Sequence, residues 1–165
     1  MKSAVRRTPP IITAAIASAA VVCAVTASRA AALSTVQPPG GESAAQTVWS
    51  GVYTADQAKR GESIVGRSCA KCHGADLTGG QDGPSLVGPE TLQAWSTMTL
   101  GDLFDRIRTT MPADAPQSLS AQETADILAY TLRLNQCPHG ENELAADRAA
   151  LSRIRISSRP DAKQP

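Results

Sequence analysis

Residues 69–73, with the sequence CAKCH, bring two thiols and one imidazole together in a single short stretch. Two cysteines separated by two residues serve three different chemistries: a thiol–disulfide redox pair, half of a zinc site, or the covalent attachment of a haem. The spacing of Cys69 and Cys72 does not by itself choose among them. The choice depends on the elements that position the motif and on the compartment in which the chain works.

Three segments around this motif carry the start signals of helices. Each begins with a hydroxyl side chain that is followed three residues later by a carboxylate or an amide, as in a capping box. Apolar residues then recur at helical spacing, which is typical of a helix that buries one face. The predicted starts are Thr54–Gln57, Thr99–Asp102 and Ser120–Glu123. The first helix runs into CAKCH, and the second ends just before Met111.

The segment between Thr54 and Asn135 contains no stretch that alternates polar and apolar residues for long enough to form a strand. We therefore predict an all-α domain of about three to four helices. A redox pair of the thioredoxin type belongs to a fold with strands, which this segment does not offer. A structural zinc site needs four ligands, and the spare candidates, Cys137 and His139, have a C-x-H spacing that is unusual for a zinc pair.

The C-x-x-C-H pattern fits haem attachment best. It supplies two thiols that add to the vinyl groups of a haem and a histidine, next to the second thiol, that reaches the iron. Covalent attachment of this kind takes place outside the bacterial cytoplasm, so it requires export. We expect one covalently bound haem. A zinc-stabilised helical module is the structural alternative, and it would be colourless.

The N-terminus carries the signals of an exported protein. Three basic side chains precede an apolar run over residues 11–27, which is the order of a signal peptide. Small residues follow, and Ala30 and Ala32 form the A-x-A arrangement of a cleavage site. We predict a signal peptide over residues 1–32 and a periplasmic location. The alternative is an uncleaved membrane anchor, although the apolar run falls just short of the roughly 20 residues that a spanning helix needs.

Removal of residues 1–32 takes away four basic residues and no acidic one. The remaining chain has twelve basic and fifteen acidic residues, a net charge near −3. A nucleic-acid partner is not expected, because such proteins need clustered lysine and arginine. Composition then predicts a flexible linker over residues 33–48, one domain over residues 49–137, and a partly disordered C-terminal extension over residues 138–165.

The segment over residues 51–135 resembles a class I c-type cytochrome. The resemblance rests on GVYTADQAKRGESIVGRSCAKCHGADLTGG, GPSLVG, TMP and ADILAYTLRLN, and CAKCHG is its most specific part. More narrowly, the segment is similar to the single-haem cytochromes that accompany periplasmic quinoprotein and other dehydrogenases. WSTMTLGDLFDRIRTTMP and PHGENEL are softer matches to that group. The resemblance implies a small cytochrome c fold around one covalently bound haem c.

The same resemblance implies the iron site. Cys69 and Cys72 are the implied thioether anchors, and His73 is the implied proximal iron ligand. Met111 matches the methionine-proline ligand of the family and stands at the head of a loop with two prolines. The other candidates for the sixth iron position are Met98, for which core packing is the better interpretation, and His139, which is expected in solvent.

Supporting residues around the haem also follow from the resemblance. The carbonyl of Pro84 is expected to accept a hydrogen bond from the ring nitrogen of His73 that does not face the iron. Leu86 is expected to pack on the porphyrin. The indole N–H of Trp95 is expected to donate to a haem propionate, and simple burial of this side chain is the alternative.

Three further positions concern the fold. Gly61 and Tyr130 resemble the pair at the crossing of the first and last helices of the family, where a missing side chain lets the helices approach. Cys137 has no evident partner once the signal peptide is removed. We expect it to be a small buried side chain, with an intermolecular disulfide as the alternative.

Together these expectations describe an electron carrier. A methionine is a neutral, soft ligand that favours ferrous iron, so a pair of His73 and Met111 raises the reduction potential relative to two histidines. We expect single electrons to pass from a dehydrogenase towards a terminal oxidase or another cytochrome. The alternative is a haem enzyme or gas sensor with an open or weakly filled sixth iron position. Membrane attachment is expected only if the N-terminal segment stays uncleaved.

Overall fold

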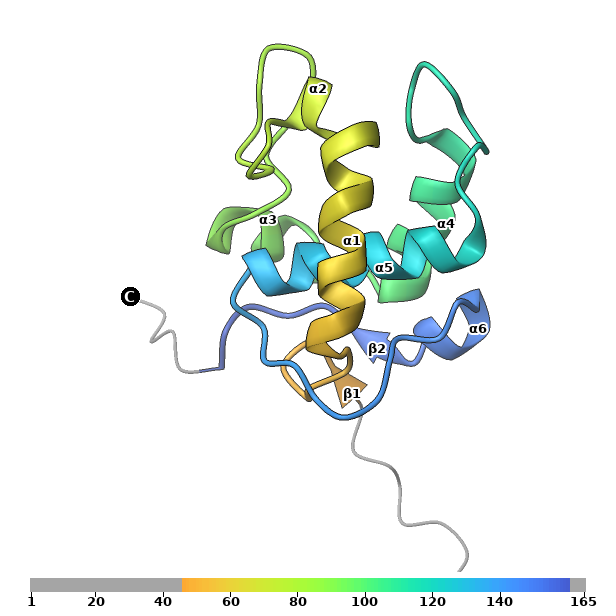
Figure 1. The fold of residues 1–165 in the computed structure, drawn as a ribbon. Helices are drawn as coiled ribbons and strands as arrows, with labels where there is room; N and C mark the ends of the chain where they lie inside the picture. The colour runs from red at the N-terminus through yellow and green to blue at the C-terminus, as the bar shows by residue number, and fades with distance from the viewer. Residues whose placement is uncertain (1–45, 161–165) are drawn as a thin grey trace, which may run out of the picture. The chain divides into compact units, whose positions relative to one another are not determined.

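The computed structural model describes residues 46–160. The predicted signal peptide and the predicted linker up to residue 45 lie outside this range. Within the range, no helix is both long enough and apolar enough to span a membrane. The elements in chain order are β1 (Gln46–Thr47), α1 (Ala55–Ser68), α2 (Ala70–His73), α3 (Pro89–Ala94), α4 (Leu100–Thr110), α5 (Ala121–Leu134), α6 (Arg148–Leu151) and β2 (Ile154–Arg155) (Figure 1).

Three longer helices carry the fold, which confirms the prediction of a mainly helical domain. α1 and α5 have 14 residues each and α4 has 11, whereas α2, α3 and α6 are short. The two strands have two residues each and pair in parallel, with Gln46 opposite Ile154 and Thr47 opposite Arg155. Both strands lie outside the segment in which the sequence predicts none.

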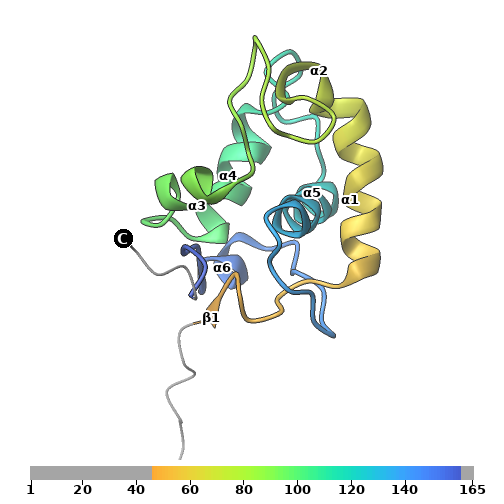
Figure 2. The same cartoon turned by 90° about the vertical axis from the view of Figure 1, so that its left-hand side faces the viewer.

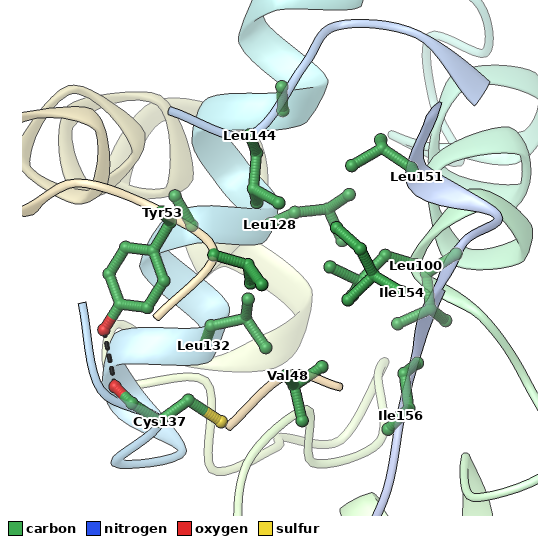
Figure 3. Close-up of a cluster of buried hydrophobic side chains, with 14 of the residues drawn as sticks. Val48, Tyr53, Leu100, Leu128, Leu132, Cys137, Leu144, Leu151, Ile154 and Ile156 are labelled. Carbon is green, nitrogen blue, oxygen red and sulfur yellow. Dashed lines mark hydrogen bonds between the residues drawn. The ribbon is translucent and has the colours of Figure 1, made fainter. Parts of the chain in front are cut away.

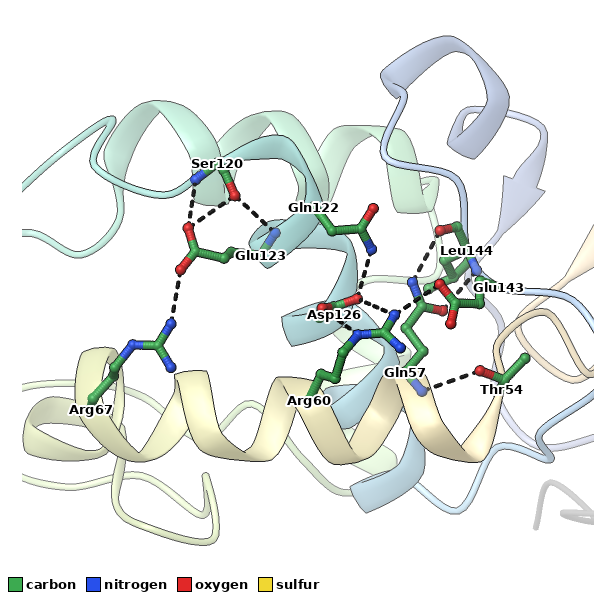
Figure 4. Close-up of polar contacts among 10 residues, drawn as sticks. All are labelled: Thr54, Gln57, Arg60, Arg67, Ser120, Gln122, Glu123, Asp126, Glu143 and Leu144. Atoms are coloured by element: carbon green, nitrogen blue, oxygen red, sulfur yellow. Dashed lines mark hydrogen bonds and ion pairs between the residues drawn. The ribbon is translucent and has the colours of Figure 1, made fainter.

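The start signals of α4 and α5 form the predicted capping boxes. Thr99 Oγ1 accepts from the Asp102 amide, and the Asp102 carboxylate accepts from the Thr99 amide. Ser120 and Glu123 make the same pair of bonds at α5 (Figure 4). Backbone N–H groups thus donate to both carboxylates, which holds the pKa of Asp102 and of Glu123 below its usual range.

The start of α1 differs from its predicted capping box. Thr54 Oγ1 accepts from the Gln57 amide at 3.1 Å, but the Gln57 side chain bonds elsewhere. It is fully buried, and its Nε2 donates to the Leu144 carbonyl at 3.0 Å while its Oε1 accepts from the Leu144 amide at 2.8 Å (Figure 4). Leu144 lies outside any helix or strand, so its buried backbone groups need a side-chain partner.

α1 and α5 cross at Gly61, as the resemblance implies, and Figure 2 views α5 nearly along its axis with α1 beside it. A Cβ at Gly61 would overlap the Asp126 carbonyl and lie 2.9 Å from Tyr130 Cβ, so a side chain there would push the helices apart. Beside the crossing, Arg60 binds the Asp126 carboxylate through Nε at 3.0 Å and Nη2 at 3.1 Å, and its Nη2 lies 2.8 Å from Glu143 (Figure 4). These ion pairs tie α1 to α5 and to the C-terminal segment.

Buried apolar side chains form two clusters. The larger one, the main core, packs α1, α4 and α5 against the C-terminal segment (Figure 3). Its members are Val48, Val52, Tyr53, Ala58, Leu92, Leu100, Leu103, Phe104, Ala125, Leu128, Ala129, Leu132, Cys137, Leu144, Leu151, Ile154 and Ile156. The second, the cavity-side cluster, consists of Ile64, Val65, Leu77, Leu119, Ile127 and Tyr130.

Cys137 is buried in the main core, which confirms the expectation of a small buried side chain. Burial raises the pKa of its thiol to about 12, against a smaller lowering by Arg159. The Tyr53 hydroxyl donates to the Cys137 carbonyl at 2.7 Å (Figure 3). This hydrogen bond therefore holds the backbone just after α5 against Tyr53.

Both ends of the described chain contribute to the main core. The packed structure extends beyond the expected domain of residues 49–137, because Val48 at one end and Ile156 at the other are part of the main core. The last three residues of the expected linker, and much of the expected C-terminal extension, thus belong to the packed structure. The apolar residues of the extension lie in α6, β2 and loops, so no single period marks them in the sequence.

Candidate haem-binding site

The CAKCH motif lies at the end of α1. Cys69 caps α1, with its amide donating to the Val65 carbonyl at 2.9 Å, and α2 then carries the remaining residues of the motif. The side chains of Cys69, Cys72 and His73 are half-buried and line the same cavity. Burial, with a smaller contribution from Cys72, raises the pKa of the Cys69 thiol. This thiol is therefore protonated at neutral pH.

The ring of His73 is held by a backbone carbonyl. Its Nδ1 lies 2.7 Å from the Pro84 oxygen. A carbonyl can only accept, so Nδ1 carries the proton and donates, and in the neutral ring Nε2 keeps its lone pair. Gly83 permits this contact, because a Cβ there would lie 2.8 Å from His73 Nδ1. The contact expected from the sequence is present, and its role at an iron ligand stays a prediction.

The residues singled out in the sequence meet at one cavity of about 660 Å³. Cofactor and small-molecule sites are commonly about 300–1,000 Å³ in volume. All of the predicted site residues line it: Cys69, Cys72, His73, Pro84, Leu86, Trp95 and Met111. Further apolar lining comes from Ala94, Leu103, Ile107, Leu119, Ile127 and Leu128. The cavity thus combines two thiols, an imidazole and a thioether with a largely apolar wall.

Met111 reaches this cavity from the end of α4. It is the C-terminal cap of that helix, in an extended backbone conformation, and its amide donates to the Ile107 carbonyl at 2.9 Å. The loop that follows lies at the same end of the domain as α2 (Figure 1). Across the mouth of the cavity, Lys71 Nζ lies 3.5 Å from Asp114 Oδ2, an exposed ion pair between α2 and this loop.

The other two candidates for a sixth iron ligand lie elsewhere. Met98 packs against the main core, and its carbonyl accepts from the Ile156 amide at 3.1 Å. His139 is exposed to solvent. Neither residue lines the cavity. Of the candidates taken from the sequence, only Met111 shares a cavity with His73.

Trp95 lies between the cavity and the main core. It is half-buried, follows α3, and packs against the apolar side chains of that core. It also lines the cavity, and its indole N–H is a hydrogen-bond donor. The donation to a propionate stays a prediction.

Part of the cavity wall was not singled out in the sequence. Ile107, Ile127 and Thr131 lie on helix faces that the apolar periodicity assigns to a core, and Thr91 and Arg106 carry no signal of their own. A helix face that packs on a cofactor and one that packs on another helix have the same periodicity. Sequence pattern could therefore identify these helix faces as buried but could not identify what they contact.

The zinc alternative has no ligand set in the described part of the chain. Within residues 46–160, no group of three or more His, Cys, Asp or Glu side chains is placed to hold a metal ion. Cys137, buried in the main core, and His139, in solvent, both lie outside the cavity that holds the CAKCH side chains. The geometry therefore does not join the two cysteine-containing segments into one site.

Comparisons with known proteins match the part of the chain that contains this site. Residues 56–130 match the family described as cytochrome C oxidase, cbb3-type, subunit III, so this part of the chain is a cytochrome c domain. The cbb3-type cytochrome c oxidase subunit CcoP of Rubrivivax gelatinosus is 27% identical over 111 residues, which are 62% of this chain and 34% of that protein. This chain thus spans about a third of that relative.

Among solved structures, the crystal structure of the sulfane dehydrogenase SoxCD from Paracoccus pantotrophus is similar to this chain with a TM-score of 0.46 and 20% sequence identity. The superposition covers 70% of this chain and 66% of that chain.

Proposed function

We propose that this protein is a single-haem c-type cytochrome that passes single electrons between redox proteins outside the cytoplasm. The observation that carries the proposal is the convergence of CAKCH and Met111 on one apolar cavity. The motif and Met111 both lie within residues 56–130, the part of the chain that is a cytochrome c domain.

The residues at the cavity fit a covalently bound haem. Its volume, about 660 Å³, and its largely apolar wall suit a flat, mostly apolar group. Cys69 and Cys72 are the thiols for thioether attachment, and neither forms a disulfide within residues 46–160. His73 keeps its Nε2 lone pair for the iron, since Nδ1 is engaged by Pro84. Met111 is the thioether for the sixth position.

When bound, the haem supplies an iron that alternates between its ferrous and ferric states. The chain controls the stability of these states. The Pro84 carbonyl fixes the tautomer of His73 and raises the basicity of the ring. Met111, a neutral soft donor, favours the ferrous state and raises the reduction potential. The largely apolar wall would limit the access of water, and His73 and Met111 together would hold the iron so that no small ligand binds to it.

The partners follow from this role. A dehydrogenase is the proposed electron donor, and a terminal oxidase or another cytochrome is the proposed acceptor. The relative from Rubrivivax gelatinosus is by its name a subunit of an oxidase, which supports an acceptor of that class. The location is proposed to be periplasmic, and it depends on residues 1–32, which lie outside the described structure.

The test is the visible spectrum of protein exported together with haem-maturation factors, compared between Met111→Ala and Met98→Ala. The unmodified protein is expected to show covalent low-spin haem with the weak methionine-to-ferric-iron band and no carbon monoxide binding. Met111→Ala should lose the band and bind carbon monoxide. Met98→Ala, which removes a methionine outside the cavity, should do neither.

Carbon monoxide binding to the unmodified protein, or an unchanged spectrum in Met111→Ala, would contradict the proposed ligand pair. Such a result would favour the alternative of a haem enzyme or gas sensor with an open or weakly filled sixth position.

A further inference from the structure

Asn135 follows α5 and is buried, with 7% of its surface exposed. All of its side-chain polar atoms are bonded to backbone groups. Its Nδ2 donates to the Leu86 carbonyl at 3.1 Å and to the Thr131 carbonyl at 2.9 Å, and its Oδ1 accepts from the Gly88 amide at 2.9 Å. The two carbonyls can only accept and the amide can only donate, so the orientation of the side chain is fixed.

Of these three bonds, the ones to Leu86 and Gly88 connect the end of α5 to another segment of the chain. That segment bends where it lines the cavity. Pro84, Ser85 and Leu86 line the cavity before the bend, and α3 with Trp95 lines it after the bend. Asn135 holds the carbonyl of the last residue on the first side and the amide of Gly88, which caps α3, on the second. One side chain therefore fixes two walls of the cavity relative to α5.

The first of these walls carries the carbonyl that holds His73. Pro84 has no N–H of its own, so its position depends on the bonds of its neighbours. Before it, the Gly83 carbonyl accepts from the Gly80 amide at 2.9 Å. The Leu86 amide donates to the Leu77 carbonyl at 2.9 Å, and the Leu86 carbonyl accepts from Asn135. Removal of Asn135 would leave the Leu86 carbonyl without this partner, two residues from the carbonyl that holds His73 Nδ1.

We propose that Asn135 is a positioning residue for the iron site: it fixes the segment of Pro84 to Leu86 and so keeps the Pro84 carbonyl against the ring N–H of His73. The proposal rests on the proposed function, because it concerns the ring that would hold the iron. Asn135 does not line the cavity, so it acts only through the backbone that it bonds.

The experiment is hydrogen exchange of the His73 ring N–H, followed by NMR in the reduced, diamagnetic holoprotein. Asn135→Leu keeps the side-chain volume and removes the three hydrogen bonds. We expect this ring proton to exchange faster by on the order of ten-fold, since only the bond to the Leu86 carbonyl holds this segment, and one lost bond is worth about a factor of five to ten in a local opening equilibrium.

Tyr53→Phe is the matched control. It removes a buried hydrogen bond of 2.7 Å to the backbone two residues beyond Asn135, on the side of the main core and away from the cavity. Thermal unfolding measures the loss of stability in each variant. In Tyr53→Phe, any loss of global stability should speed the exchange of the His73 ring proton and of the α5 backbone amides by the same factor. In Asn135→Leu, the ring proton should be accelerated more than these amides.

Equal acceleration in the two variants, or no acceleration in Asn135→Leu, would overturn the proposal. If Asn135→Leu does not yield holoprotein, Asn135→Ala, which removes the same bonds without apolar bulk, is measured with the same expectation. Failure of both to yield holoprotein while Tyr53→Phe does so would show a general folding role and overturn positioning. An unmodified protein without low-spin covalent haem would instead contradict the proposed function itself.

Discussion

At the main core, Val48, Leu151 and Ile156 are at most 1% exposed, whereas at the cavity Cys72, His73 and Met111 are only half-buried. The main core is closed by side chains of the described chain itself. The cavity also has apolar side chains in its wall, but they surround a space of about 660 Å³. The same small domain thus contains one region that its own residues fill and one that is shaped for another group.

Polar groups show the same difference. In the main core, buried polar groups are bonded within the chain, as when the Gln57 side chain bonds both backbone groups of Leu144. At the cavity, the side chains of Cys69, Cys72 and His73 line an open space, and His73 is bonded through Nδ1 to the Pro84 carbonyl. The main core therefore stabilises the fold, and the cavity offers side-chain groups that could bind a cofactor. Changes at main-core residues that do not line the cavity should alter stability without altering the proposed iron site, whereas Leu103 and Leu128 belong to both regions.

The largest effect is expected at the crossing that both regions share. In Gly61→Ala the added Cβ overlaps the Asp126 carbonyl, and we expect a loss of roughly 3 kcal/mol or more in the free energy of unfolding. Gly66→Ala is the control on the same helix, because a Cβ there meets nothing within 4 Å. It should stabilise the protein by about 0.5–1 kcal/mol. Urea unfolding of both holoproteins measures the difference, and equal stabilities would contradict the close crossing.

A large truncation in the main core should separate stability from the iron site. Leu151 is fully buried in α6, so Leu151→Ala is expected to cost about 3 kcal/mol in the free energy of unfolding. Its visible spectrum should match that of the unmodified protein. A changed methionine band in this variant would show that the two regions are coupled more tightly than the structure indicates.

A smaller loss is expected from the bond between α1 and the C-terminal segment. Gln57→Leu leaves the buried amide and carbonyl of Leu144 without partners, at a cost of about 2 kcal/mol. Gln122→Leu removes the side-chain amide of an exposed glutamine and should change stability by less than about 1 kcal/mol. The urea concentrations at the unfolding midpoints of the two variants provide the comparison, if the unfolding free energy depends on urea concentration with the same slope in both. Similar losses would argue against the buried bond to Leu144.

At neutral pH the smallest effect is expected at Cys137, because the contribution of its thiol to stability changes only at alkaline pH. Burial raises the pKa of the Cys137 thiol from 9.0 to about 12, so this thiol ionises in the unfolded chain before it does so in the folded protein. Its contribution to stability is complete below pH 9 and is lost as the pH rises towards 12. Unfolding free energies measured across this interval should fall less steeply in Cys137→Ala. Equal slopes would contradict the burial of the thiol.

The sequence predicted much of the cavity end, because its chemistry depends on residue types at fixed spacing. CAKCH and Met111 could be singled out by type and local context, Pro84 followed from the family resemblance, and all of them line the cavity. The helix starts at Thr99 and Ser120 could likewise be predicted from neighbouring residues, since a capping box involves residues three apart.

The remaining parts of the structure depend on contacts between residues far apart in the chain. Gln57 has the residue type for a capping box, yet its partner is Leu144, 87 residues away. The C-terminal apolar residues enter the main core from α6, β2 and loops, which are too short to show a period. Asn135 is a single polar residue after a helix, and only the folded backbone of Leu86 and Gly88 gives it a role.

The central claim is that residues 69–73 attach one haem in the cavity, and the most direct measurement is the intact mass of the exported protein made with haem-maturation factors. The account predicts a mass that exceeds the polypeptide by one haem, with denaturant leaving the haem attached. It also predicts that the double variant Cys69→Ala and Cys72→Ala has the mass of the polypeptide alone. A colourless unmodified protein, or one that releases its haem on denaturation, would contradict the claim.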